Sequence, residues 1–359
     1  MNYKNNWIKS KGFDLAFILL PPFVCLLLIV IFPSFFETHE SNQLVWFVLV
    51  LCIDVGHVYT TIYRTYLDKE TLNKNKLLFY FSPIVLYIVG VVLHSTDSIF
   101  FWRCITYLAV FHFIRQQYGF MRLYARNDVS KLSRIIDTIT IYSATIYPIL
   151  YWHLNGKLDF NWFVENDFFY LDKPVLIPFF FLIFVTVLIL YFAKEFFFSI
   201  KNKEFNLAKN LIIIGTIVSW YFGIVYFKGD LTFTFLNVVS HGIPYYALVW
   251  AYGNKSKIIE SKQTLLSKLF KVKYILLFIA LVLLLAYFEE MLWDGLVWKE
   301  HFSIFPTTYF LPDLSNNSDV LSLLIPLLSM PQILHYFIDG FIWKVKNDKF
   351  GWSTFLIKK

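Results

Sequence analysis

Charged residues are scarce in this chain. Only 16% of its 359 residues are Asp, Glu, Lys or Arg, whereas 58% are hydrophobic and 21% are aromatic. A soluble globular protein carries about 25% charged residues, so the composition excludes an ordinary soluble domain and predicts a polytopic membrane protein. The formal net charge of +7 does not indicate nucleic acid as a partner, because the basic residues fall between hydrophobic runs, where they act as topology signals.

Cysteine is also rare. The three cysteines, Cys25, Cys52 and Cys104, all lie in apolar stretches, so they offer neither a disulfide framework nor a paired-cysteine metal motif. The sequence contains no HExxH, no clustered HxxHH boxes, no glycine-rich phosphate loop, no DDxxD and no GxSxG. These absences leave serine or cysteine nucleophile chemistry without support.

Long apolar runs make up most of the sequence. About ten of them are long enough to cross a membrane as helices, at roughly 13–36, 43–63, 77–95, 98–121, 132–153, 174–198, 209–227, 231–252, 272–292 and 319–343. The first run is too long for a secretory signal, and no small-residue cleavage site follows it. We therefore expect an all-α, polytopic integral membrane helical bundle of about ten transmembrane helices, forming a single domain over residues 1–359.

The basic residues are distributed unevenly around these runs. The N-terminus, the loops after every second run and the C-terminal tail hold all but five of the 32 basic residues, the exceptions being Arg103, Lys157, Lys173, Lys228 and Lys299. Basic loops stay in the cytoplasm, so we expect both termini there, with the longest outer loops at roughly 154–173 and 293–318. The expected location is the cytoplasmic (inner) membrane of a bacterium.

The eight histidines divide into two sets of four. His39, His94, His153 and His301 fall in outer loops or at outer helix ends, and His57, His112, His241 and His335 fall inside the second, fourth, eighth and tenth runs. Counted back from the cytoplasmic ends at about 1.5 Å per residue, the second set lies roughly 9 to 17 Å deep. A single histidine in a membrane helix is usually a hydrogen-bond partner between helices, but four at one depth predict a common site.

Two carboxylates accompany this layer. In LCIDVGHVYTTIYRTY, Asp54 precedes His57 by three residues, and in HYFIDG, Asp339 follows His335 by four. These spacings put each carboxylate on the same helix face as its histidine. A charge in a membrane helix costs about 2.5–3.5 kcal/mol on insertion scales, so it is retained where it pairs, ligates or lines water.

Other polar residues flank the remaining two histidines. Arg115 and Gln116 follow His112 in FHFIRQQYGFMRLY, and Asn237 lies one turn before His241 in LNVVSHGIPYY. We expect Arg115 and Gln116 to bind a polar substrate group or a water, and Asn237 to support His241.

Neutral imidazole is the commonest metal ligand, and its other N–H usually goes to a carboxylate or a carbonyl. We therefore predict that His57, His112, His241 and His335 bind a metal ion, with Asp54 and Asp339 orienting the ligands or completing the shell. Mixed histidine and carboxylate coordination suits non-haem iron. Glu289 and Glu290, near the outer end of the ninth run, are expected to lie too far away to ligate directly.

A polytopic membrane chain with single histidines on separate helices resembles the bacterial Brp/Blh type of β-carotene 15,15′-dioxygenase. The resemblance covers the general architecture and His57, His112, His241 and His335, although SHGIPYY and HYFIDG differ from the family's PHG-x-x-D-H-like and HFG-like contexts. It implies a histidine-bound non-haem iron and a lipid-soluble polyene substrate cleaved by O₂.

Four functional classes stay open on the sequence. The first is an iron-dependent membrane oxidoreductase or oxygenase acting on a hydrophobic small molecule, a lipid or an isoprenoid. The second is a transferase acting on a lipid-linked substrate, with Arg64, Arg115 or Arg122 holding an anionic headgroup. The third is a b-type haem protein with paired axial histidines, and the fourth is a transporter or proton pathway.

Overall fold

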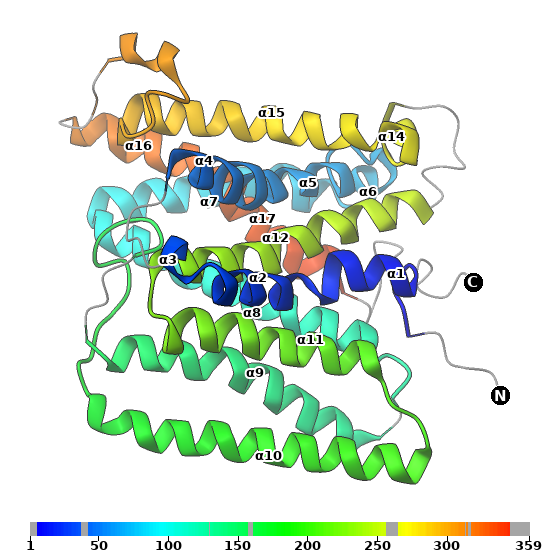
Figure 1. Cartoon of the computed structure of the whole chain (residues 1–359). Helices are drawn as coiled ribbons and strands as arrows, with labels where there is room; N and C mark the ends of the chain where they lie inside the picture. Colours follow the sequence, from blue (N-terminus) through cyan, green and yellow to red (C-terminus); the bar gives the residue numbers. More distant parts are fainter. Residues whose placement is uncertain are drawn as a thin grey trace. The chain divides into compact units, whose positions relative to one another are not determined.

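The computed structural model describes residues 6–36, 42–128, 130–156, 161–255, 265–312, 314 and 317–344 (Figure 1). Helices make up most of these ranges, with the longest non-helical stretches at 161–173 and 299–305, and no strand occurs in them. The all-α prediction is therefore confirmed for the described part of the chain. His39 lies outside it.

Two compact units make up the chain. Unit 1 comprises Met1–Glu40 and Val110–Pro244, and unit 2 comprises Ser41–Ala109 and Tyr245–Lys359. Two long helices, α8 (Ser98–Tyr124) and α12 (Asp230–Lys255), contribute residues to both units.

Several helices have the length and apolarity that a membrane requires. Among the described residues there are five of these, Gln43–Arg64, Lys76–Thr96, Pro174–Lys201, Leu207–Tyr226 and Val272–Trp298. Two bent helix pairs raise the number to as many as seven, Lys11–Leu19 with Pro21–Ile31 and Ser318–Leu328 with Met330–Ile342. Each of the seven coincides with a predicted run, so a helical membrane protein is supported.

The other three predicted runs, 98–121, 132–153 and 231–252, are also helical, within α8, α9 (Lys131–Leu154) and α12. They fall outside the candidate spans because polar residues interrupt their apolar stretches. Ten crossings and cytoplasmic termini stay predictions.

Prolines account for the two bends. The first pair is bent by 52° and resumes at Pro21, and the second is bent by 40° and resumes with Pro331 in its first turn. Proline lacks an N–H and clashes with the preceding turn, so it is favoured at the start of a helix, and a bend just before it relieves the clash.

Unit 1 contains the N-terminal helices and the middle of the chain. Its elements are α1 (Lys11–Asp14), the π-helix η1 (Leu15–Leu19), α2 (Pro21–Ile31), α3 (Pro33–Phe36), α9, the 3₁₀ turn η3 (Pro174–Leu176), α10 (Ile177–Asn202), α11 (Leu207–Ile217) and the π-helix η4 (Val218–Tyr226). Helices α9, α10 and α11 lie side by side (Figure 1). Phe179, Leu182 and Phe196 of α10 are exposed, as expected for a surface that faces lipid.

Unit 2 contains the second and last parts of the chain. Its elements are α4 (Gln43–Trp46), the π-helix η2 (Phe47–Val55), α5 (Gly56–Arg64), α6 (Lys69–Lys74), α7 (Lys76–Thr96), α14 (Leu265–Leu269), η5 (Val272–Tyr274), α15 (Ile275–Trp293), the π-helix η6 (Asp294–Trp298), η7 (Pro306–Phe310), α16 (Ser318–Leu328) and α17 (Met330–Ile342). Helix α17 packs against both α5 and α7. Phe79, Ile338 and Ile342 form a buried cluster between α7 and α17, which fixes the position of α17.

Candidate functional site

Unit 2 brings His57 of α5 and His335 of α17 together. Their ring centroids are 4.9 Å apart with an interplanar angle of 83°, and each residue is 1% exposed. One ring nitrogen of each lies within 4.8 Å of one of the other. Two helices far apart in the sequence therefore deliver a buried imidazole pair.

The backbone before His57 fixes its tautomer. The His57 Nδ1 atom lies 3.2 Å from the Ile53 carbonyl oxygen. A carbonyl only accepts hydrogen bonds, so Nδ1 carries the proton and Nε2 carries the lone pair that a metal needs. Asp54 Oδ1 lies 3.8 Å from the same nitrogen, in agreement with the face-sharing predicted from the spacing.

A π-helix precedes this histidine. In η2, the Cys52 carbonyl accepts a hydrogen bond of 2.9 Å from the Tyr246 hydroxyl. The hydroxyl lies so close to Gly56 that a Cβ atom there would collide with it. π-Helical segments inside helices often occur at functional sites, and η2 ends at Val55, two residues before His57.

His335 is held by a hydrogen-bond chain with a definite direction. The Tyr245 hydroxyl donates to Asp339 Oδ1 at 2.6 Å, and the Thr61 hydroxyl lies 2.9 Å from the Tyr245 oxygen. Because the Tyr245 hydroxyl proton already points to Asp339, the Thr61 hydroxyl must be the donor to the Tyr245 oxygen. Thr61 then accepts from His335 Nδ1 at 2.7 Å, which leaves the lone pair of His335 on Nε2.

Unit 1 contains a second pair, His112 of α8 and His241 of α12. Their centroids are 5.0 Å apart with an interplanar angle of 82°, and the residues are 5% and 0% exposed. The Phe113 ring stacks on His241, with centroids 3.7 Å apart and planes within 9°. This stacking fixes the plane of the His241 ring.

Two glutamines hold the α12 backbone beside this pair. Gln116 Nε2 donates to the His241 carbonyl at 2.8 Å, and Gln117 Nε2 donates to the Ser240 carbonyl at 3.3 Å. The Gln116 Oε1 atom is buried and has no hydrogen-bond partner within the described ranges. This atom can accept a hydrogen bond from a donor, and the expected role of Gln116 stays a prediction.

Arg115 and Asn237 have partners other than the histidine rings. Arg115 is exposed and donates to the Tyr142 hydroxyl at 2.7 Å, with its guanidinium over the Tyr118 ring. Asn237 donates to the carbonyls of Ser219 and Phe233. Asn237 therefore ties α12 to η4.

Two buried glutamates on α15 lie within electrostatic range of Asp54. Glu289 and Glu290 are 5% and 8% exposed, and both interact electrostatically with Asp54. Helix α15 packs against both η2 and α5, which accounts for this proximity to Asp54. That the two glutamates lie too far from the histidines to ligate directly stays a prediction.

The described outer histidines have local partners. His94 Nδ1 lies 3.4 Å from the Ser322 hydroxyl, and His153 Nδ1 lies 2.6 Å from the Ile149 carbonyl. His301 stacks on Trp46 and lies 3.4 Å from Asp294. These contacts account for the three side chains as parts of the fold.

The sequence reasoning missed three side chains that hold His335. Thr61, Tyr245 and Trp343 are joined to it through the hydrogen-bond chain, since Trp343 Nε1 also donates to the Tyr245 oxygen at 3.4 Å. Thr61 follows His57 by four residues, so the helical spacing carried a signal. Nothing in the sequence links Tyr245 to Asp339.

Chemically, each pair offers two buried imidazoles, and in the unit 2 pair both lone pairs are assigned to Nε2. Carboxylates stand next to both histidines of that pair. Such donors suit a first-row transition metal. Comparison with protein-family models, curated proteins and solved structures found no match to the chain.

Proposed function

We propose that the protein is an integral-membrane metalloenzyme that binds iron through His57, His112, His241 and His335. The observation that carries the proposal is the same in both units: two buried imidazoles from two different helices, with centroids 4.9 or 5.0 Å apart. The depth count along the sequence supports a single ion shared by all four histidines.

The spacing of the rings within each pair fits a shared ion. A metal–nitrogen bond is about 2.1 Å long, and a ring nitrogen lies about 1.1 Å from its ring centre. Two imidazoles on one ion then have centroids about 4.5 Å apart at a 90° angle, about 5.2 Å at a tetrahedral angle and about 6.4 Å when they are opposite each other. The observed 4.9 and 5.0 Å match adjacent ligands.

The same calculation favours non-haem iron over haem. Axial histidines on a haem lie opposite each other across the porphyrin, which requires ring centroids about 6.4 Å apart. The centroids of the two pairs are only 4.9 and 5.0 Å apart. A visible absorption spectrum of the purified protein checks this point, because a Soret band would overturn the non-haem assignment.

The substrate in this proposal is a hydrophobic small molecule, a lipid or an isoprenoid. A bound iron would supply oxidative chemistry with O₂, and the resemblance to the β-carotene dioxygenases points to a polyene. The chain's own residues position the ligands: Asp54 stands beside His57, and Asp339 holds His335 through Tyr245 and Thr61. The buried Gln116 Oε1 accepts a hydrogen bond from a polar group of the substrate or from a water.

The topology in this proposal has ten crossings and both termini in the cytoplasm of a bacterial cell. Its support is the distribution of the basic residues and the apolar, exposed faces of the candidate spans. Reporter fusions after residues 128, 204 and 229 test it, since the first two fusions are expected inside and the third outside.

Metal analysis of the purified protein tests the function. We expect about one equivalent of iron if the four histidines share one ion, and about two if each pair binds its own. His57→Ala and His112→Ala are expected to lose the same single ion in the first case. His153→Ala, whose ring is bonded to a backbone carbonyl, is the matched control. Iron, zinc, manganese and copper all below about a tenth of an equivalent would overturn the proposal.

A further inference from the structure

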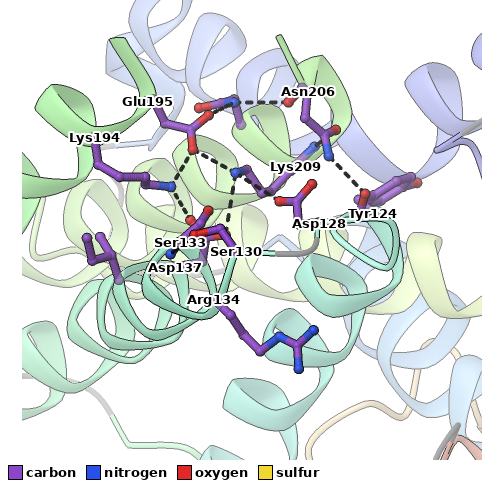
Figure 2. A network of polar contacts seen from close by, with 12 residues as sticks. Tyr124, Asp128, Ser130, Ser133, Arg134, Asp137, Lys194, Glu195, Asn206 and Lys209 are labelled. Atoms are coloured by element: carbon purple, nitrogen blue, oxygen red, sulfur yellow. Dashed lines mark hydrogen bonds and ion pairs between the residues drawn. The ribbon is translucent and has the colours of Figure 1, made fainter. Parts of the chain in front are cut away.

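A cluster of charged side chains lies in unit 1, where Asp137 and two lysines are buried and Glu195 and Asp128 are 11% and 24% exposed. Lys194 of α10 pairs with Asp137 of α9 and with Glu195 (Figure 2). Lys209 Nζ, from α11, lies 2.6 Å from Glu195 Oε1 and 3.4 Å from both Asp137 Oδ2 and Asp128 Oδ2. The two lysine side chains are 4% exposed, and Asp137 is 0% exposed. Charges at such positions require partners.

The charges of this cluster do not balance. Asp128, Asp137 and Glu195 supply three carboxylates, whereas Lys194 and Lys209 supply two ammonium groups. Two arginines lie nearby in the sequence, but neither compensates for the third carboxylate. Arg134 is exposed and directed away from the cluster in Figure 2, and Arg126 donates to the backbone carbonyls of Asn6, Trp7 and Leu123. In the wall of the adjoining cavity, Lys203 is matched by Glu204, so these two residues leave the balance unchanged. Within the described ranges, the cluster is therefore short of one positive charge.

A cavity of about 300 Å³ opens onto the cluster. Carboxylates of Asp128, Glu195 and Glu204 line it, together with Lys203, Lys209, serine and asparagine side chains and two phenylalanines. The Ser133 residue in its wall is 5% exposed, and no hydrogen bond from its hydroxyl occurs in the described part of the chain. The cavity thus combines spare oxygen acceptors with a missing positive charge.

We propose that this cavity binds a primary ammonium group, and that the group belongs to the headgroup of an ethanolamine phospholipid. An ammonium has three donors and no acceptor, which matches the carboxylate and hydroxyl oxygens of the wall. Its charge would balance the cluster. The volume lies at the small end of ligand pockets, so it accommodates a headgroup and not a whole lipid.

The position of the cavity favours a lipid as the source of the amine. Residues 203 to 206 of its wall join two consecutive candidate spans, Pro174–Lys201 and Leu207–Tyr226, which places the cavity at the membrane surface in the proposed topology. Lys203 lies in the wall, where its ammonium group can bind the phosphate of the lipid. The exposed Phe205 can contact the acyl chains. A choline headgroup carries no N–H, so it cannot make the same hydrogen bonds.

Native mass spectrometry of the full chain tests the proposal. Protein in micelles containing equal amounts of phosphatidylethanolamine, phosphatidylcholine and phosphatidylglycerol is expected to retain the ethanolamine lipid at least about tenfold more than the other two, because hydrogen bonds to charged groups contribute that much. Asp128→Asn removes one carboxylate without changing its shape, and it is expected to abolish the preference. Glu70→Gln, on an exposed carboxylate of α6, is the matched control.

Two further arms keep the outcome decisive. Ser133→Ala is expected to lower the preference severalfold, and it decides the matter if Asp128→Asn does not fold. Free ethanolamine is the second probe: binding of ethanolamine without any lipid preference would reassign the cavity to a soluble amine. Equal retention of the three lipids together with no ethanolamine binding would overturn the proposal. None of these results depends on a metal at the histidines.

Discussion

Tyr245 donates a hydrogen bond of 2.6 Å to Asp339, and this bond sets the direction of the whole chain that ends at His335. Since the Tyr245 proton points to the carboxylate, the Thr61 proton must point to Tyr245, and the His335 Nδ1–H must point to Thr61. A carboxylate three hydrogen bonds away thus determines which nitrogen of His335 is available to a metal. Partners of this kind raise ligand basicity and fix ring orientation.

Tyr245→Phe removes the hydroxyl that bonds to Asp339 and Thr61 and leaves the aromatic ring in place. We expect metal affinity to fall about 10- to 100-fold, as is typical when the partner of a metal ligand is lost. A competition titration against a chelator measures it. Tyr226→Phe, on an exposed tyrosine, is the control and is expected to leave the affinity unchanged. Unchanged metal affinity in Tyr245→Phe would show that the hydrogen bonds from Asp339 to His335 do not affect metal binding by His335.

Thr61→Val probes the middle of the same chain. Valine has a similar shape but can neither accept from His335 nor donate to Tyr245, so two buried partners lose a bond. The expected loss is about 1–3 kcal/mol in the free energy of unfolding, measured by denaturant titration in detergent. Thr96→Val, at an exposed hydroxyl bonded to the Val92 carbonyl, should cost much less. Equal losses in the two variants would contradict the assigned hydrogen bonds.

Helical spacing predicted the local part of the site. Asp54 beside His57 and Asp339 beside His335 follow from residues three and four apart on one face, and both distances are 3.8 Å. The apolar runs likewise marked the helices. These features depend on neighbours along one helix, which the sequence displays directly.

Contacts between segments far apart in the sequence could not be predicted from helical spacing or hydropathy. Thr61 meets Tyr245 across 184 positions and His335 across 274, and hydropathy carries no information about which helix faces which. The cluster of Lys194 and Lys209 illustrates the same limit. Its lysines were counted as topology signals, whereas the structure buries them against Asp137 and Glu195.

Gly56 tests the close approach of Tyr246 to the π-helix. Gly56→Ala is expected to destabilise the protein by about 1–3 kcal/mol, because the new methyl group must displace the Tyr246 hydroxyl in a packed interior. Gly119→Ala is the control, since nothing lies within 4 Å of a Cβ there, and alanine is the better helix former. Combining Gly56→Ala with Tyr246→Phe should recover part of the loss. A Gly56→Ala variant as stable as Gly119→Ala would disprove the contact.

Lys194→Met tests whether the charge cluster stabilises unit 1. Removing the ammonium leaves Asp137 and Glu195 facing each other with only Lys209 between them, and an uncompensated buried charge costs about 3–5 kcal/mol. The variant is therefore expected to unfold at markedly lower denaturant. Lys74→Met breaks the exposed pair with Glu70 and should have almost no effect, because exposed ion pairs contribute little. Adding Asp137→Asn to Lys194→Met removes one of the two opposed carboxylates, so the double variant should be more stable than Lys194→Met alone. If it is less stable instead, the loss arises from packing and not from the unbalanced charge.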